Sequence, residues 1–397
     1  MKIFPCVVII GPRQCGKTIL AKSLRPDWKY FDLENIQTFD KIHDDINFFF
    51  QKNNSQLIID ESQLSPKLFG AIRGEIDNDR NNKNRFILTG SSSPELLESV
   101  SESLAGRSAV IELSPFKYNE ILENKLPEFY SIFKNEYKND LSYLLNLNSR
   151  VSLDHVLDSF LRGGYPEPLT YNNQFDYKNW MEEYYKSYVA RDIKRLFPRI
   201  DSLKFKRFII MLSSLSGTII NRSNLGRSLN VNEGTIKNYL DIVHGTMLWR
   251  NIPSFEKSKI KSVIKMSKGV FRDSGFNNYL QGLHSFSKLD NSPLVGKNFE
   301  SFIIEEIIRG VSATSATRWD YSYFRTKSGS EIDLILDGDF GLIPIEIKYG
   351  TSTRLKDLTG LNKFINDHEL YYGIVINNAH DIELISDKII QIPSRFI

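Results

Sequence analysis

Residues 11–18 read GPRQCGKT, a full match to the phosphate-loop pattern G-x-x-x-x-G-K-[ST], and this feature restricts the fold most strongly. Such a loop needs a strand before it and a helix after it, because consecutive backbone N–H groups must curl around phosphate oxygens. The apolar run at residues 6–10 and the helical pattern from Ile19 onward meet both needs. The sequence therefore predicts a binding site for ATP with Mg²⁺.

The chemistry of the loop residues assigns their contacts. Lys17 is expected to reach the β- and γ-phosphate oxygens, and the Thr18 hydroxyl is an expected ligand of Mg²⁺. A chance match in an unrelated loop is the alternative, against which the flanking strand and helix argue. The predicted cofactor-binding residues are Gly11, Pro12, Arg13, Gln14, Cys15, Gly16, Lys17, Thr18, Ile19 and, from farther along the chain, Thr89.

A second acidic motif favours hydrolysis over simple binding. Residues 57–60 form an apolar run that ends in Asp60, which would hold Mg²⁺ through water, and Glu61 would polarise the attacking water. Thr89, which follows the run at 85–88, suits a sensor of the γ-phosphate. Arg107 would supply positive charge to the transition state, in cis or across a subunit interface. The alternatives are a solvated acidic turn, a plain strand end and, for Arg107, a surface salt bridge.

The pattern of the chain changes three times. Residues 1–114 alternate β-rich runs (6–10, 29–33, 57–60, 85–88 and 109–113) with helix-length segments, which is typical of a parallel α/β sheet. Residues 115–199 carry aromatic amphipathic stretches and predict a helical lid or linker. Residues 200–256 predict short helices followed by an extended element, and residues 257–397 return to a mixed α/β pattern.

Residues 223–240 predict a helix, a turn and a second helix, as in a winged-helix domain. The expected core is Leu225, Leu229, Val231, Ile236 and Leu240. In a DNA-binding winged helix the second helix enters the major groove, here with Thr235, Lys237 and Asn238 outward and Trp249 and Arg250 on the wing. Winged helices also dock proteins, and this one carries little charge besides the basic stretch at 257–261. Both interpretations stay open.

Two predicted strands near the C-terminus, residues 331–336 and 342–348, carry acids and a lysine. Strand residues two apart share a face, so Glu346 and Lys348 point the same way and Asp333 on the partner strand meets them. This matches the core of PD-(D/E)xK nucleases, whose carboxylates bind Mg²⁺. Glu300, on a predicted helix at 297–309, is the expected additional ligand, with Glu305 or Glu306 as alternatives. A hairpin of alternating charge also produces this pattern by chance.

The bulk properties restrict the setting. Lys and Arg total 51 against 48 Asp and Glu, a net charge of +3 that neither supports nor excludes a nucleic-acid partner. Cys6 and Cys15 lie too close together for a secreted disulfide framework. No apolar run approaches the roughly 20 residues that cross a bilayer, and the first residues lack a signal-peptide cleavage pattern. We therefore expect a cytoplasmic protein that does not enter membranes.

Four of these motifs, at residues 11–18, 58–63, 89–91 and 104–107, resemble the AAA-type ATPase domain of prokaryotic "archaeal ATPase" families. Further matches at 161–167, 190–193, 271–275 and 325–348 are similar to the group in which that domain is fused to a C-terminal domain of unknown function, DUF4143. The resemblance covers nearly the whole chain. It implies an additional-strand P-loop fold, a helical and winged-helix middle, and a restriction-endonuclease-like C-terminal domain over residues 257–397.

Two functional hypotheses follow. The first is a Mg²⁺-dependent ATPase coupled to a nuclease or nucleic-acid-processing domain, with Lys17, Asp60, Glu61 and Arg107 catalytic in one domain and Asp333, Glu346 and Lys348 in the other. The metal ligands would be Thr18, Asp60, Glu300, Asp333 and Glu346. The second is an ATP-gated switch that binds DNA or a protein, with a catalytically inactive nuclease-like dock. DNA and a second copy of the chain are candidate partners in both.

Overall fold

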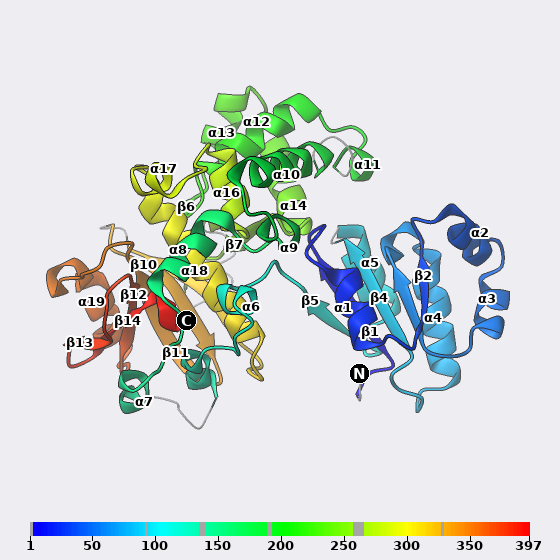
Figure 1. Ribbon diagram of the computed structural model, residues 1–397, viewed down its shortest axis with the longest axis horizontal. Coiled ribbons are helices and arrows are strands. Elements are labelled where there is room, and N and C mark those ends of the chain that lie inside the picture. The colour runs from blue at the N-terminus through cyan, green and yellow to red at the C-terminus, as the bar shows by residue number, and fades with distance from the viewer. Residues whose placement is uncertain (1–2, 92–93, 135–139, 189–192, 257–265, 327–328) are drawn as a thin grey trace. The chain divides into compact units, whose positions relative to one another are not determined.

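The computed structural model describes residues 3–91, 94–134, 140–188, 193–256, 266–326 and 329–397 (Figure 1). The motif residues 190–192 and the basic stretch at 257–261 lie outside this described part. The chain forms two compact units. One comprises Met1–Pro115 and Leu240–Leu248, and the other comprises Phe116–Tyr239 and Trp249–Ile397.

A five-stranded, fully parallel sheet forms the first unit, with the strand order β2-β3-β4-β1-β5. Each strand overlaps one of the β-rich runs, so the predicted parallel α/β sheet is confirmed. The strands are β1 (Cys6–Gly11), β2 (Lys29–Asp32), β3 (Leu57–Asp60), β4 (Phe86–Ser91) and β5 (Ser108–Glu112).

Both faces of this sheet are covered, because alternate residues of its strands enter two separate cores. Val8 and Ile59 pack with the helices on one face, whereas Val7 and Ile58 pack with α1 on the other. Strands buried on both faces need continuous apolar runs, so polar side chains gather where the strands end. The helices are α1 (Lys17–Leu24), α2 (Ile36–Asp44), α3 (Ile46–Lys52), α4 (Lys67–Asn78) and α5 (Pro94–Ser103).

Helices dominate the middle of the chain, as the sequence predicts, and side-chain caps start several of them. Ser152, Asn173 and Asp201 each accept a hydrogen bond from a backbone N–H of the first turn that follows. The helices are α6 (Tyr118–Ile121), α7 (Leu141–Leu145), α8 (Leu153–Arg162), α9 (Pro166–Leu169), α10 (Gln174–Ser187), α11 (Lys194–Leu196) and α12 (Ser202–Ser213).

The helix, turn and helix expected at 223–240 are α13 (Arg222–Leu229) and α14 (Glu233–Gly245). Asn230, between them, has a left-handed φ of 51°, a conformation that asparagine tolerates better than most residues. Asn232 accepts a hydrogen bond from the Thr235 N–H at 2.7 Å and so starts α14. The extended element that follows is β7 (Trp249–Ile252). It pairs with β8 (Lys268–Phe271), which also pairs with β6 (Thr218–Ile219).

The C-terminal part is a six-stranded mixed sheet in the order β13-β14-β12-β11-β10-β9. Its strands are β9 (Asp320–Arg325), β10 (Glu331–Gly338), β11 (Gly341–Ile347), β12 (Gly373–Asn377), β13 (Glu383–Ser386) and β14 (Ile389–Pro393). The helices that precede or cover it are α16 (Ser274–Leu280), α17 (Phe286–Asp290), α18 (Val295–Ser312) and α19 (Thr359–Asp367).

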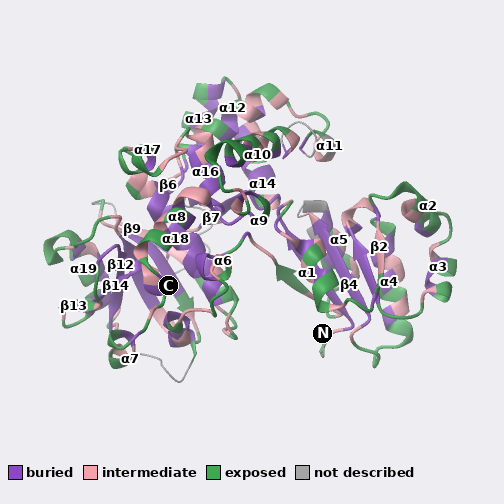
Figure 2. Ribbon diagram, in the orientation of Figure 1, coloured by how far each residue is buried: buried purple, intermediate pink, exposed green. Residues whose placement is uncertain are grey.

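Two helices cover opposite faces of this mixed sheet. Ile303 of α18 shares a core with Leu334 and Ile345, whereas Ile365 of α19 shares one with Ile335. Figure 2 shows α18 buried along most of its length, which is why its polar residues must all find partners. Among the described helices, none combines the length and the apolar character that a membrane span requires.

Candidate functional site

The phosphate loop connects the end of β1 to the start of α1 and depends on two glycines. Gly16, just before α1, has a φ of 97°, a left-handed conformation that glycine adopts without strain. A Cβ on Gly11 would lie 2.2 Å from the Leu113 carbonyl oxygen. Gly16 has no side chain to cap α1, so the first backbone N–H groups of the helix face the loop. This is the geometry that binds phosphate.

Lys17 is the buried cation of the loop. Its side chain is only 5% exposed, and its ammonium donates to the Pro12 carbonyl at 2.7 Å and to the Gly11 carbonyl at 3.3 Å. These carbonyls hold the ammonium against the inner side of the loop. The arrangement puts a positive charge beside the N–H groups that would receive the phosphates.

Asp60, at the end of β3, is the centre of the polar contacts in this unit. Its carboxylate accepts a hydrogen bond from the Thr18 hydroxyl at 2.6 Å, from the Tyr30 hydroxyl at 2.8 Å, and from the Thr89 hydroxyl. It also accepts from the Glu61 N–H at 3.0 Å. The structure therefore brings together Thr18, Asp60 and Thr89, which the sequence predicted from three separate motifs.

Tyr30 is a member of this site that sequence reasoning missed. It lies on β2, whose residues pair with those of β3, with Tyr30 opposite Ile58 and Asp32 opposite Asp60. Burial, with the hydrogen bond to Asp60, raises the pKa of the Tyr30 hydroxyl and keeps it a donor. The signal was available, because the carboxyl ends of adjacent parallel strands meet at one edge of a sheet.

Glu61 follows Asp60 in a strained conformation. Its φ is 52°, a left-handed conformation that is uncommon for a residue with a Cβ. The Gln63 amide donates to its carboxylate, and the Ser62 hydroxyl donates to the Thr89 carbonyl at 3.0 Å. These hydrogen bonds hold the turn after β3 against the end of β4 and so fix the position of the Glu61 backbone.

The remaining loop residues make ordinary contacts. Arg13 forms an ion pair with Glu34 at 3.3 Å, and the Cys15 thiol donates to the Leu113 carbonyl at 3.4 Å. Gln14 and Ile19 are exposed.

Arg107 forms two hydrogen bonds with Asp77, at 2.9 and 2.8 Å, and this pairing, together with Arg80, lowers the pKa of Asp77 to about 2. Arg107 therefore stands in the surface salt bridge that the sequence left as its alternative.

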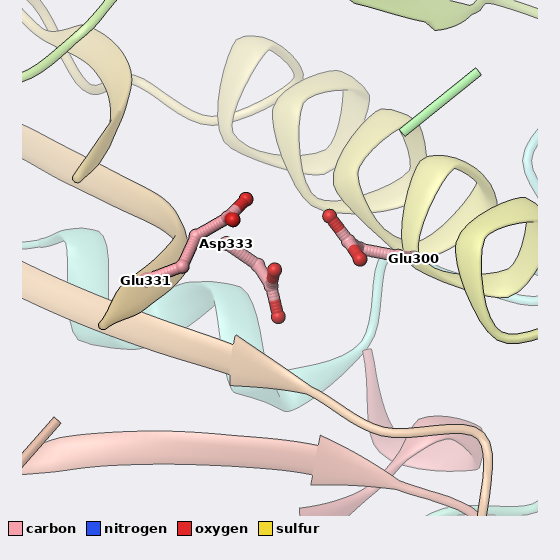
Figure 3. Close-up of side chains that lie close together, drawn as sticks. All are labelled: Glu300, Glu331 and Asp333. Carbon is pink, nitrogen blue, oxygen red and sulfur yellow. The ribbon is translucent and has the colours of Figure 1, made fainter. Parts of the chain in front are cut away.

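The second unit holds a buried acidic cluster around the predicted nuclease residues. Glu300 of α18 and Asp333 of β10 point toward each other together with Glu331, a residue that sequence reasoning missed (Figure 3). One oxygen from each of the three carboxylates lies within 4.8 Å of the others. The Lys348 ammonium donates to Glu346, the next predicted acid, and the Ile347 N–H donates to Asp333 at 2.9 Å. All four predicted residues therefore lie in one region.

Lys268 of β8, which no motif predicted, lies among these acids. Its side chain is completely buried, and its ammonium donates to Glu300, to Glu331 at 3.2 Å and to Asp333 at 3.2 Å. A second lysine, Lys297, donates to the other oxygen of Glu300 at 2.7 Å. The carboxylates of Glu300, Glu331 and Asp333 are thus each hydrogen-bonded to a lysine ammonium group.

The charges of this cluster shift the pKa values of its acids in opposite directions. Burial raises the pKa of the Asp333 carboxyl, but the nearby lysines, Lys268 first, outweigh it and leave the pKa below its usual value. Burial and the charge of Asp333 raise the pKa of Glu346 to about 8. Two neighbouring buried carboxyls share the available positive charge unequally.

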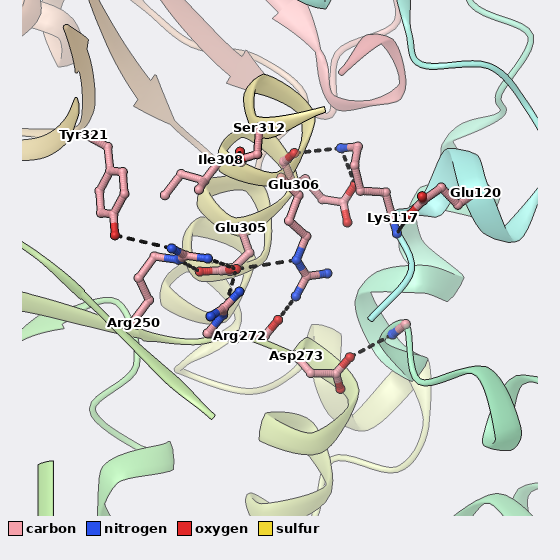
Figure 4. A network of polar contacts seen from close by, with 12 residues as sticks. Lys117, Glu120, Arg250, Arg272, Asp273, Glu305, Glu306, Ile308, Ser312 and Tyr321 are labelled. Atoms are coloured by element: carbon pink, nitrogen blue, oxygen red, sulfur yellow. Dashed lines mark hydrogen bonds and ion pairs between the residues drawn. The ribbon is translucent and has the colours of Figure 1, made fainter. Parts of the chain in front are cut away.

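Glu305 and Glu306, the alternatives to Glu300, belong to a different network (Figure 4). The carboxylate of Glu305 pairs with Arg250 at 2.5 Å, Arg309 at 3.5 Å and Arg272 at 3.7 Å. Burial raises the pKa of Glu305, but the three arginines outweigh it and hold it below its usual value. Glu306 accepts from the buried ammonium of Lys117 at 2.8 Å. Arg250, predicted to lie on a DNA-binding wing, is buried in this network.

The predicted recognition helix presents the expected side chains. Lys237 and Asn238 of α14 are exposed, Thr235 is half-buried, and Ile236 between them is buried. Leu225, Leu229 and Leu240 are buried as well, and Val231 is partly so. Trp249, by contrast, is completely buried, so neither wing residue that the sequence suggested faces outward.

The parallel sheet, the glycine loop after β1 and the acid at the end of β3 define the first unit as a P-loop nucleotide-binding domain. Residues 4–122 match the family described as AAA domain, residues 153–287 match a domain of unknown function (DUF8612), and residues 295–397 match a domain of unknown function (DUF4143). The chain therefore carries an AAA-type P-loop domain at its N-terminus and a DUF4143 domain at its C-terminus, as the resemblance implied.

Alignments with similar proteins cover nearly the whole chain. Uncharacterized proteins from Mycobacterium tuberculosis and Mycobacterium bovis are each 27% identical over 393 residues, which cover 98% of this chain and 80% of the relative. An uncharacterized protein from Methanocaldococcus jannaschii is 24% identical and covers 91% of this chain and 79% of its own.

Among solved structures, the Thermotoga maritima RuvB Holliday junction branch migration motor is similar, with 16% identity and a TM-score of 0.29. The match covers 63% of this chain and 83% of the RuvB chain. This likeness is slight and bears on neither the site nor the function.

Proposed function

We propose that the first unit binds ATP with Mg²⁺ and hydrolyses it. The observation that carries the proposal is the convergence on Asp60 of the Thr18 and Thr89 hydroxyls, beside a loop built to receive phosphates. A hydroxyl and a carboxylate that already touch form the donor set that Mg²⁺ uses beside a nucleotide. The residues present therefore fit the cofactor.

The side chains would divide the work of hydrolysis. Lys17 and the N–H groups at the start of α1 bind and orient the phosphates, and Thr18 with Asp60 would hold Mg²⁺, which neutralises charge on the phosphates when bound. Glu61 accepts a proton from the attacking water and aligns it. Thr89, hydrogen-bonded to Asp60, would sense the γ-phosphate.

Replacement of Lys17 tests this proposal. Lys17→Ala should lower phosphate release from ATP to below about one hundredth of the wild-type rate, because the charge on the phosphates loses its buried partner. Lys52→Ala, at the exposed end of α3, is the matched control and should leave the rate unchanged. Hydrolysis that survives in Lys17→Ala at the wild-type rate would refute the assignment.

For the rest of the chain, the second candidate function is the ATP-gated switch that binds DNA or a protein. Two observations support it over the predicted nuclease. The exposed Lys237 and Asn238 of α14 present polar groups to a partner, and the buried Lys268 already neutralises the acids that a nuclease would use for Mg²⁺. The C-terminal domain would then serve as a dock rather than as a cleaving enzyme.

Binding and cleavage assays separate these roles. The switch should bind duplex DNA with an affinity that falls with salt and differs between ATP and ADP, without cutting it. Lys237→Ala should weaken that binding, whereas Lys363→Ala, on α19, should not. Cleavage of any DNA or RNA by the wild type with Mg²⁺ or Mn²⁺, lost in Asp333→Ala or Lys348→Ala, would instead establish the nuclease.

A further inference from the structure

The acidic cluster of Glu300, Glu331 and Asp333 has the spacing of a metal site when the three carboxylates are considered alone (Figure 3). Oxygen-rich sites of this kind bind Mg²⁺ or Mn²⁺ directly. A metal site, however, needs carboxylate oxygens whose negative charge is not already matched. The partners of these three acids therefore decide what the cluster does.

All three carboxylates are hydrogen-bonded to the same ammonium group. Lys268 donates to one oxygen each of Glu300, Glu331 and Asp333. An ammonium group has three N–H donors, so the three acids use the full capacity of Lys268. The lysine head lies where the three carboxylates converge, which is the position that a shared metal ion would need.

The fold holds Lys268 in this position. Its strand, β8, is the middle strand of the three-stranded sheet, and Lys268 pairs with Ile219 of β6 on one side and with Ile252 of β7 on the other. The side chain is 0% exposed, so its ammonium has no route to water that leaves the surrounding packing intact. A buried ammonium without its acids is strongly disfavoured.

Other donors hold several of the acid oxygens that Lys268 does not reach, whereas Oε2 of Glu346 is buried without a hydrogen-bond partner in the described part of the chain. Lys297 donates to the second oxygen of Glu300, and Lys348 donates to Glu346. The second oxygen of Asp333 accepts from the Ile347 N–H. A divalent cation would have to displace these contacts and lie beside a fixed positive charge, so the residues present do not fit a catalytic Mg²⁺.

We infer that Lys268 takes the place of a divalent cation and makes the cluster a metal-independent ionic lock that joins β8 to α18 and β10. The nuclease-like arrangement of acids then holds the second unit together instead of binding metal. This inference deepens the second candidate function, since it gives the reason why the dock would not cleave, and it does not depend on ATP hydrolysis.

Mn²⁺ binding to the full-length, nucleotide-free protein tests the inference. Thr18→Ala is present throughout, so that the other expected metal ligand set is weakened. Electron paramagnetic resonance should detect no Asp333-dependent Mn²⁺ binding at about millimolar concentration. Adding Lys268→Met, which keeps the length of the side chain but removes its charge, should create a Mn²⁺ site. This site should bind Mn²⁺ at least about tenfold tighter than that millimolar limit. A further Asp333→Asn change should abolish that site, whereas Lys268→Arg should not create one.

Three results would overturn the inference. Mn²⁺ binding by the protein that retains Lys268, lost on Asp333→Asn, would show that the lysine does not exclude metal. A folded Lys268→Met protein that gains no Mn²⁺ site would show that Lys268 does not occupy the place of a divalent cation. If Lys268→Met does not fold, the comparison of Lys268-containing protein with and without Asp333→Asn still decides. DNA cleavage, measured in parallel, tests the second candidate function separately. Metal binding without cleavage would overturn the ionic lock but leave the non-cleaving dock standing.

Discussion

The two acidic sites of this protein differ in the groups that satisfy their carboxylates. Asp60, in the first unit, accepts hydrogen bonds from the neutral hydroxyls of Thr18, Tyr30 and Thr89. Asp333, in the second, is bound by the charged ammonium of Lys268. Neutral donors orient a carboxylate but leave its negative charge for a cation to match, whereas an ammonium removes that charge. The acid at the end of β3 and the acid near the start of β10 thus offer a cation different amounts of unmatched negative charge.

The largest effect is expected when Asp60 of the first site loses its charge. Asp60→Asn should reduce ATP hydrolysis by about 100-fold or more, because a metal ligand that acts through water loses its charge. It should change thermal stability far less than the rate, since the amide oxygen still accepts from the donors of one carboxylate oxygen and the amide NH2 can donate to hydroxyls that faced the other. Phosphate release and a calorimetric melt measure the two effects. A rate close to wild type would place Asp60 outside the metal site.

Removal of the ammonium from the second site should show the opposite pattern. Lys268→Ala should lower the free energy of unfolding by about 3–5 kcal/mol, because it leaves three acids buried without their shared partner. ATP hydrolysis at a temperature where the variant is folded should stay at the wild-type rate. Lys297→Ala, whose lysine is 44% exposed, is the control and should cost less than about 1 kcal/mol. Equal costs for the two lysines in urea unfolding would contradict the lock.

A smaller change tests whether the neutral donors matter individually. Tyr30→Phe removes one hydroxyl from Asp60 and should slow hydrolysis by about fivefold, equivalent to about 1 kcal/mol, the size of one hydrogen bond. The rate constant at saturating ATP is the quantity to measure. Tyr171→Phe, in the second unit, is the control. No effect of Tyr30→Phe on the rate would confine the orientation of Asp60 to the two threonines.

The smallest expected effect concerns Arg107. Because its guanidinium is held by two hydrogen bonds to Asp77, we expect Arg107→Ala to leave ATP hydrolysis within about twofold of the wild type. Asp77→Ala, which frees the arginine, should do the same. A loss of about 10³-fold in Arg107→Ala alone would instead identify the arginine as a transition-state group that leaves its salt bridge.

The core of the first unit was predictable because its elements are encoded locally. The runs at 6–10 and 57–60 are apolar because the sheet buries both faces of β1 and β3, and the glycine pattern at 11–18 lies between a strand and a helix, as a phosphate loop requires. Each signal lies within a few residues. The convergence of Thr18, Asp60 and Thr89 then follows from the rule that parallel strands end at one edge.

The second unit was predictable only in part. The strands around Asp333 and Glu346 and the helix that carries Glu300 appear where expected. Arg250 and Trp249, expected on an exposed wing, are buried instead, because Trp249 packs on Phe271 of β8 and Arg250 pairs with Glu305 of α18. Strand periodicity alone does not tell which neighbour covers a face.

The sequence by itself determined a P-loop domain and the order of acids and lysine in the C-terminal hairpin, since both depend on residues close together in the chain. Only the tertiary structure decided the partners of those acids. Lys268 comes from a separate strand and precedes the matched segment at 271–275 without being part of it, and its charge reaches Glu300, Glu331 and Asp333 through the packing of three elements. Electrostatic interactions act across space and ignore separation in sequence, so the same acids could be metal ligands or parts of a lock until their neighbours were placed.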